Sequence, residues 1–448
     1  MTWKRWERVH MPRKKLALVG GVTYANCANQ TYINARARAL STYFDVQILN
    51  TVSEISDDVK HWDELYKQCS NFDLVNIDCE LGFFGKTIPL MKERLINLIN
   101  ASEKVIFTMH RIDTGEDHKE FSILYAEIIK TLRDRPLDKP FFILVHTPRD
   151  KRVVELTHAI KNVDVYPVCY FQEKEISNFR DHERRTKWRK KHGFNDDHFI
   201  VGVFGVLAAY KEPNTVIKAI EHLPDNYHLA FIGGEHEISL HAGNTAETDR
   251  RLNFIHECIS CSGDKKLIER IHFLGTVYDT NEFNLAMASV NYVVVSHKEC
   301  GQSASGVLST ALQLGCRIVA SKNSNIMEYH RVFFDASFEM FDPHNFMELK
   351  HKIQFFDYLQ PNHHEKSENH YSLNGLAKRY VKLSDLMDSK EYTNEYEPGK
   401  IEALISKLSM QPTQVLTNAY PMINRLTFNG YLLKYIPNKL KNTIKYWL

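Results

Sequence analysis

The chain lacks the features that mark several classes of protein. Its 57 Lys and Arg residues nearly balance 55 Asp and Glu residues, so no overall field attracts nucleic acid. No apolar run approaches the ~20 residues that span a bilayer. The basic segment Met1–Lys15 lacks the apolar core of a secretory signal, so we expect a cytoplasmic protein. With 448 residues, 43% of them hydrophobic, the chain is long enough for two or three domains.

The cysteines also lack a pattern. The eight cysteines are scattered, as is typical of reduced thiols in a large intracellular chain. Cys258 and Cys261 form one C-x-x-C beside His256, but no second pair follows at the spacing of a structural zinc site. We therefore predict no metal, while this motif leaves metal or redox use as an alternative.

Short apolar runs alternate with helix-length amphipathic segments along most of the chain. The runs in the first part are Leu16–Gly20, Val46–Leu49, Leu74–Ile77, Val105–Met109 and Phe141–Val145. Those in the second part are Ile200–Phe204, Leu229–Ile232, Ile271–Leu274, Asn291–Val295 and Ile318–Ala320. Runs of this length between helices predict parallel strands that are buried on both faces. The sequence therefore predicts an α/β protein with two doubly wound, Rossmann-like domains.

We predict three parts: a first Rossmann-like domain over 1–175, a second over 176–360, and a helical tail over 361–448. The segment Gln172–His198 between the domains carries six basic residues close together. It would suit either a nucleic-acid patch or a solvated helix that enters the second domain. We favour the helix and expect no nucleic-acid partner.

The segment Ser296–Ser321 has the pattern of a strand end, a loop of small residues, a helix and a second strand. Ser303, Ser305 and Gly306 lie where the helix is expected to begin. The positive end of a helix, with exposed backbone N–H groups, is suited to binding a pyrophosphate. The alternative is a serine that only caps a core helix.

Two further segments place glycines after predicted strands. Gly205 follows the strand that ends at Phe204, and Lys211 lies in the loop before a helix that starts near Pro213. A lysine there could neutralise a departing phosphate, although an isolated lysine is usually only solvated. Gly20 and Gly21 follow the first strand and permit close approach, but they lack the full G-x-G-x-x-G spacing.

Polar side chains follow two more strands of the first domain. Glu80 comes after the strand Leu74–Ile77, while His110 and Arg111 come after Val105–Met109. The carboxyl ends of parallel strands face the ligand crevice of open α/β sheets. A single His at a strand end is more often structural, but its neighbours favour a site here.

Taken in order, these segments resemble the retaining GT-B glycosyltransferases of glycosyltransferase family 4, over about Leu16–Leu386. The first domain contributes FDLVNIDCELGFFG, KVIFTMHRID and FFILVHTPRDKRVVEL. The second contributes VGVFGVLAAYKEPNTVIKAI, HLAFIGG, IHFLGTV and QSASGVLSTALQLGCRIVAS. The resemblance implies a UDP- or GDP-sugar donor, a retained anomeric configuration and no metal cofactor. The absence of a D-x-D motif suits this expectation.

The resemblance also implies a role for each candidate residue. The expected catalytic residues are His110, Lys211 and Gln302. The expected donor-binding residues are Gly20, Gly21, Gly205, Glu299, Ser303, Ser305, Gly306 and Thr310. On the acceptor side it places Glu80 and Arg111. The family usually has two Glu residues eight apart around the diphosphate loop, where this chain has Gln302 and Thr310. Val206 replaces the Arg that often accompanies the loop lysine, and Glu299 stands three positions from the first acid.

The end of the chain, Asn429–Leu448, carries four lysines, no acidic residue and several aromatic and aliphatic residues. Such a segment could lie on an anionic membrane surface or pack back across the domains. The membrane alternative would place the protein on the inner face of the cell membrane and suit a lipid-linked acceptor.

The sequence thus predicts a retaining glycosyltransferase for a glycan or lipid-linked acceptor, in the synthesis of a surface polysaccharide or similar glycoconjugate. Two alternatives stay open. One is a non-catalytic glycosyltransferase-like subunit, suggested by the replaced acids and Arg. The other is a sugar-nucleotide epimerase of the same fold.

Overall fold

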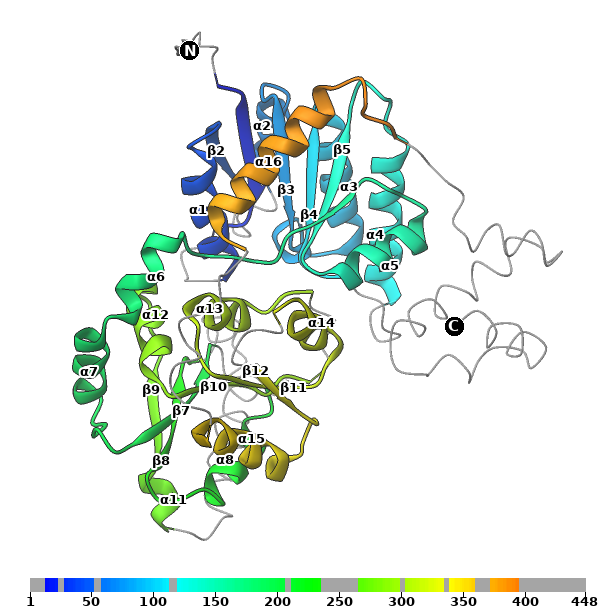
Figure 1. Cartoon of the computed structure of the whole chain (residues 1–448). Coiled ribbons are helices and arrows are strands. Elements are labelled where there is room, and N and C mark those ends of the chain that lie inside the picture. The colour runs from blue at the N-terminus through cyan, green and yellow to red at the C-terminus, as the bar shows by residue number, and fades with distance from the viewer. Residues whose placement is uncertain are drawn as a thin grey trace, which may run out of the picture.

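Two parallel β-sheets with helices on both faces form the body of the protein in a computed structural model (Figure 1). The residues that the structure describes are 13–22, 28–51, 58–112, 119–205, 211–234, 265–298, 303–333, 338–358 and 371–394. The predicted fold class, an α/β protein with two such domains, is confirmed.

The first sheet has the order β2-β1-β3-β4-β5-β6, with all pairs parallel. Its strands are β1 (Lys15–Gly20), β2 (Asp45–Asn50), β3 (Leu74–Cys79), β4 (Val105–Met109), β5 (Phe141–Val145) and β6 (Val163–Val165). Its helices are α1 (Ala28–Leu40), α2 (Val59–Cys69), α3 (Ile88–Ala101), α4 (Lys119–Arg133) and α5 (Pro148–His158), with a 3-10 turn, η1 (Leu81–Phe83), after β3.

The second sheet has the order β12-β11-β10-β7-β8-β9 and is also parallel. Its strands are β7 (Phe199–Phe204), β8 (Tyr227–Ile232), β9 (Ile271–Gly275), β10 (Tyr292–Val295), β11 (Ile318–Ser321) and β12 (Phe338–Phe341). The helices that accompany it are α8 (Pro213–Glu221), α11 (Lys265–Glu269), α12 (Thr280–Ser289), α13 (Gly306–Leu314), α14 (Ser324–Val332) and α15 (Phe346–Tyr358).

Strand residues alternate between two buried faces. In β1, Leu16 and Leu18 join one apolar cluster, while Ala17 and Val19 join another on the opposite face. This follows from the two-residue period of a strand. The first of these clusters continues into the second domain through residues such as Leu308. One face of each sheet therefore contributes to the same apolar cluster.

Ten of the twelve strands within the described ranges coincide, to within about two residues, with the apolar runs of the sequence. The other two, β6 and β12, have no counterpart among those runs. Both lie at the edge of a sheet and have three and four residues. Each is also interrupted by an acidic residue, Asp164 in β6 and Glu339 in β12, so neither forms an apolar run.

The basic segment between the domains forms two helices, α6 (Glu173–Arg180) and α7 (His182–Lys191). Trp188 is buried, and Lys191 forms an ion pair with Glu282 at 2.7 Å. Arg189 donates to the side-chain oxygen of Asn291 at 3.2 Å. Several of these basic side chains therefore bind the second domain, as expected for a helix that enters it.

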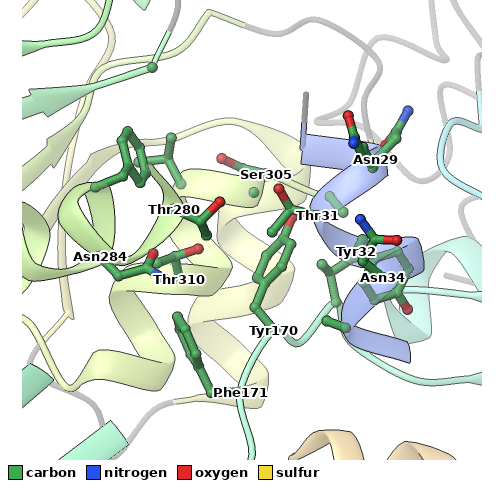
Figure 2. Close-up of a pocket in the computed structure, with 18 of the residues that line it drawn as sticks. Asn29, Thr31, Tyr32, Asn34, Tyr170, Phe171, Thr280, Asn284, Ser305 and Thr310 are labelled. Atoms are coloured by element: carbon green, nitrogen blue, oxygen red, sulfur yellow. The ribbon is translucent and has the colours of Figure 1, made fainter. Parts of the chain in front are cut away.

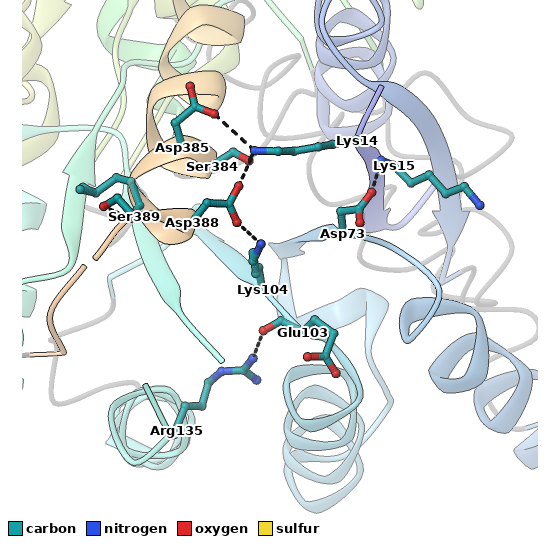
Figure 3. A network of polar contacts seen from close by, with 11 residues as sticks. Lys14, Lys15, Asp73, Glu103, Lys104, Arg135, Ser384, Asp385, Asp388 and Ser389 are labelled. Atoms are coloured by element: carbon teal, nitrogen blue, oxygen red, sulfur yellow. Dashed lines mark hydrogen bonds and ion pairs between the residues drawn. The ribbon is translucent and has the colours of Figure 1, made fainter. Parts of the chain in front are cut away.

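A late helix, α16 (Leu373–Asp388), returns to the first domain and packs on α1 (Figure 1). Figure 3 shows its C-terminal end, where Asp388 contacts both Lys14 and Lys104. In its middle, the Tyr380 hydroxyl contacts Asn76 and accepts from Arg36 at 3.2 Å, all buried. The first domain is thus completed by residues from far along the sequence.

Within the described ranges, no helix is both long and apolar enough to cross a membrane. The segment Asn429–Leu448, with its two alternatives, lies outside those ranges, as do Cys258 and Cys261.

We predict that Tyr380→Phe lowers the free energy of unfolding by about 1–2 kcal/mol, because it leaves buried Asn76 and Arg36 with one partner fewer. Asp388→Ala, at the half-exposed end of the same helix, should cost less than about 1 kcal/mol. Urea unfolding followed by circular dichroism compares the two. An equal or larger loss for Asp388→Ala would contradict this order.

Candidate active site

One cavity of about 860 Å³ lies between the two domains and is lined by residues of both. In Figure 2, Asn29, Thr31 and Asn34 lie on α1 on one side, and Thr280, Asn284, Ser305 and Thr310 lie on the facing helices. The rings of Tyr170 and Phe171, from the chain that joins the domains, stand between them. The cavity thus meets the carboxyl ends of both sheets, where open α/β folds bind ligands.

The amine of Lys211 lies at the end of β7. It donates to the carbonyl oxygen of Phe204 at 2.8 Å, and the residue is 6% exposed. A Cβ atom on Gly205 would lie 2.9 Å from this Nζ and 3.6 Å from Cγ2 of Val307 in the first turn of α13. The lysine amine and the first turn of α13 therefore both lie next to Gly205.

Two strand ends approach closely beside this lysine. Gly205 has φ +80°, and a Cβ on Gly233 would lie 2.1 Å from the carbonyl oxygen of Gly205. No side chain fits at Gly233, so the ends of β7 and β8 can meet only with glycine at that position. Both glycines line the cavity.

The first turn of α13 presents backbone donors to the same cavity. The Ser305 side chain caps the helix and accepts from Leu308 N at 3.3 Å. The amides of Gly306 and Val307, in the first turn, have no partner within the helix. The serine cap therefore does not occupy the amides of Gly306 and Val307, because it uses the amide of Leu308.

Burial lowers the pKa of the Lys211 amine to about 8. It also lowers the pKa of His297, which lines the cavity, to about 3, with the positive charge of Lys211 as the second cause. Lys211 is therefore a buried cation at neutral pH, and His297 is neutral beside it. An anion in the cavity would compensate this cation.

A chain of buried polar groups lies under the cavity on the side of the first domain. Arg36 pairs with Asp78, whose other oxygen lies 2.8 Å from Nε2 of His110. The Nδ1 atom of His110 lies 2.9 Å from Nε2 of His146, and Nδ1 of His146 lies 3.0 Å from the carbonyl oxygen of Tyr166. Both ring nitrogens of His110 are thus engaged inside the protein. The backbone oxygen of His110 accepts from Ser303 N at 3.1 Å across the two domains.

The structure brings most of the sequence-predicted residues to this cavity and leaves others aside. Those that line it are Glu80, His110, Arg111, Gly205, Lys211, Ser305, Gly306 and Thr310. Ser303 is buried next to it, with its amide bound to His110. Glu299 and Gln302 lie outside the described residues.

The glycine pair after β1 has a packing role in this structure. A Cβ on Gly21 would lie 2.2 Å from the ring of Phe83, and one on Gly20 would lie 2.7 Å from Ile33. Neither glycine is among the residues that line the cavity, whereas Phe83 is. Gly21 thus leaves room for the Phe83 ring at the cavity wall.

Sequence reasoning missed the polar residues of α1 and α12 and the aromatic pair Tyr170 and Phe171. Their helices show no strand-end signal, so only the folded chain places them at the cavity. The sequence did contain one signal for the part of the cavity at the end of β8, the adjacent glycines Gly233 and Gly234. Glycines in this position indicate a close approach of another backbone segment.

Chemically, the arrangement offers a buried cation and the first N–H groups of a helix to an anion, with both neutral polar and charged side chains around them. Among the residues that the structure describes, no three His, Cys, Asp or Glu side chains gather in a way that could hold a metal ion.

The family model of glycosyl transferases group 1 matches residues 184–371, which is most of the second domain. The predicted enzyme class, a glycosyltransferase, is confirmed at this level. No curated protein matches the sequence.

Solved structures extend the likeness to the first domain. The Anabaena protein HepE, in complex with UDP and glucose, has 14% identity and a TM-score of 0.56, covering 84% of this chain and 98% of that one. Sucrose-phosphate synthase from Thermosynechococcus elongatus has 14% identity and a TM-score of 0.58, covering 90% and 100%. An α,α-trehalose-phosphate synthase from Burkholderia xenovorans, in complex with glucose-6-phosphate, has 8% identity and a TM-score of 0.59, covering 82% and 99%. At such identities the likeness shows the fold, a two-domain GT-B architecture.

We predict that Lys211→Met stabilises the free protein at about pH 7, by up to about 3 kcal/mol, because wild type buries a charged amine there. The pKa of Lys211 is lower in the folded protein than in the unfolded chain, so the wild-type protein gains stability as pH rises above about 8. The difference in stability between Lys211→Met and wild type should therefore become smaller at high pH. Urea unfolding at about pH 7 and about pH 9 measures both effects. Lys382→Met, at an exposed position of α16, is the control and should change little at either pH. A clear loss of stability for Lys211→Met at neutral pH would contradict the prediction.

Proposed function

We propose that the protein is a retaining, metal-independent glycosyltransferase of family 4. It transfers a sugar from a nucleotide-sugar donor to a glycan or lipid-linked acceptor in the synthesis of a surface polysaccharide or similar glycoconjugate. The observation that carries the proposal is the position of the Lys211 amine beside the first turn of α13, inside a cavity shared by two domains.

The donor diphosphate would rest between Lys211 and the amides of Gly306 and Val307. A buried ammonium and a helix N-terminus together provide the positive charge that a leaving diphosphate needs, in a site with little water. A UDP-sugar is the first donor to test, since the similar Anabaena protein binds UDP and UDP-glucose. A GDP-sugar is the second.

In this reaction the bond between the anomeric carbon and the diphosphate oxygen breaks while the acceptor oxygen bonds to the same face of that carbon. The leaving phosphate takes the acceptor proton, so the protein need not supply a base. Lys211 and the helix amides act by stabilising the charge that develops on the leaving oxygen. This role corresponds to that of a metal ion in metal-dependent transfer, which is why we propose no metal.

The wall formed by α1 would receive the acceptor. It presents the neutral side chains of Asn29, Thr31 and Asn34, with Glu80 and Arg111 from the strand ends beside it. Amide and hydroxyl groups both donate and accept, so they suit the hydroxyl groups of a glycan. A cytoplasmic location would follow, with the tail Asn429–Leu448 touching the membrane where the acceptor is lipid-linked.

One observation favours a second candidate, a non-catalytic subunit. Thr310, where the family resemblance implies a carboxylate, lines the cavity on the same side as Asn284, another neutral side chain. A donor nucleotide would thus lack one acidic partner. A sugar-nucleotide epimerase is the third candidate and differs in needing no acceptor.

We predict that UDP or GDP raises the melting temperature of the full chain, because the buried amine of Lys211 gains a counter-charge. A thermal-shift series with UDP, GDP, ADP, CDP and TDP measures this. A non-catalytic subunit would respond to none of the five. Incubation with the matching nucleotide sugar then separates the enzymes, since an epimerase would release nucleotide and free sugar without an acceptor.

We predict that Gly205→Ala weakens binding of the stabilising nucleoside diphosphate by about tenfold or more, because its methyl group would displace the Lys211 amine. Gly193→Ala is the matched control: φ is +79° there against +80° at Gly205, but nothing lies within 4 Å of the added Cβ. The left-handed backbone should cost each variant about 1–2 kcal/mol of stability. Isothermal titration calorimetry with both variants is the test, and equal affinities would remove Lys211 from the proposed site.

A further inference from the structure

We infer that His110 and His146 share one additional proton when an anionic diphosphate occupies the cavity, so that donor binding is coupled to proton uptake by this pair. His146 is then a positioning residue that acts through His110. That a diphosphate binds in the cavity rests on the proposed function. That the two rings need a third proton to fill their contacts rests on the geometry alone.

Three contacts in a row define the proton requirement. The first joins Asp78 to Nε2 of His110 at 2.8 Å, the second joins the two rings at 2.9 Å, and the third joins Nδ1 of His146 to the Tyr166 carbonyl at 3.0 Å. Asp78 is held as a carboxylate by its pair with Arg36, and a peptide carbonyl has no proton, so both ends of the row only accept.

Two neutral imidazoles carry two protons, which is one fewer than three contacts need. If each ring donates outward, to Asp78 and to Tyr166, two bare nitrogens face each other at 2.9 Å. If one ring instead turns its N–H toward the other, a bare nitrogen faces the carboxylate or the carbonyl. One added proton from the solvent, bound to Nδ1 of His110 or Nε2 of His146, fills all three contacts.

Burial opposes this third proton in the empty protein. It lowers the pKa of His110 to about 4, with the positive charge of Arg36 adding to the effect and Glu80 opposing it. It lowers the pKa of His146 well below its usual range, where His110 and Arg36 contribute in the same direction. Tyr32 packs edge-on against both rings, and its own pKa is raised by burial, so it supplies no charge near neutrality.

An anion in the cavity would reverse the balance. His110 lines the same cavity as Lys211, Ser305 and Gly306, and its carbonyl binds the loop that leads into α13. The ion pair of Arg36 and Asp78 is neutral as a unit, so the protonated pair would be a net cation that faces the diphosphate site. A nearby negative charge stabilises a cation and raises its pKa.

The first experiment measures protons taken up on binding. The full chain is titrated calorimetrically at about pH 6.5, where Lys211 is already charged, in two buffers with different heats of ionisation. UDP-glucose or GDP-mannose is the probe, according to which nucleotide stabilises the chain, because an esterified diphosphate has no proton that titrates near neutrality. Wild type should take up a substantial fraction of one proton, and its affinity should rise as pH falls toward 6.

Two variants assign that proton. In His146→Gln, the side-chain amide can donate to Nδ1 of His110, so this contact is filled without an extra proton and the uptake should vanish. His158→Gln is the matched control, since burial also lowers the pKa of His158 to about 4, and its uptake should equal that of wild type. Burial raises the pKa of Asp150 to about 6, so this residue could also take up a proton. Because Asp150 is present in wild type and in both variants, its contribution to proton uptake cancels when they are compared. Uptake that persists in His146→Gln would overturn the inference.

The second experiment needs no ligand, and it separates failure of this inference from failure of the proposed function. Nitrogen NMR of the histidine-labelled full chain distinguishes bare from protonated ring nitrogens, and the two variants His110→Gln and His146→Gln assign the signals. On acidification the pair should gain one proton in a single step seen at both rings. Two separate protonations, or none before unfolding, would overturn the shared proton whatever the protein binds.

Discussion

A buried ammonium group beside a helix N-terminus is the constraint on which the rest of the site depends. Lys211 is nearly fully buried, and its partner in the described structure is a peptide oxygen, that of Phe204. Such a charge costs stability unless an anion joins it. Gly205 leaves room for this amine at the cavity wall, since a Cβ there would lie 2.9 Å from Nζ.

The two domains contribute different chemical groups to the cavity. The second domain offers the cation and the amides of α13, whereas the first offers neutral polar side chains on α1 and the buried row that ends at His110. The contact from Ser303 N to the His110 carbonyl ties one side to the other. The loop that leads into α13 is therefore bonded directly to the strand end that carries His110.

The helix α16 explains why the first domain depends on residues far along the chain. Tyr380 from this helix reaches Arg36 and Asn76, and Arg36 in turn pairs with Asp78 under the cavity. A helix remote in sequence thus supports the row that holds His110. Local patterns could not reveal this link, because the partners are about three hundred residues apart.

Local sequence determined ten of the described strands, the helix cap at Ser305 and the placement of Lys211, Glu80 and His110 near strand ends, since all of these follow from short-range periodicity and the direction of parallel strands. Only the tertiary structure decided which strand ends share one cavity. It also showed that Gly20 and Gly21 pack against side chains rather than line that cavity, and that His110 has both ring nitrogens occupied. The physical reason is that contacts between distant segments depend on how the two sheets and α16 pack together. A pattern within a few residues carries no information about which distant segments will meet.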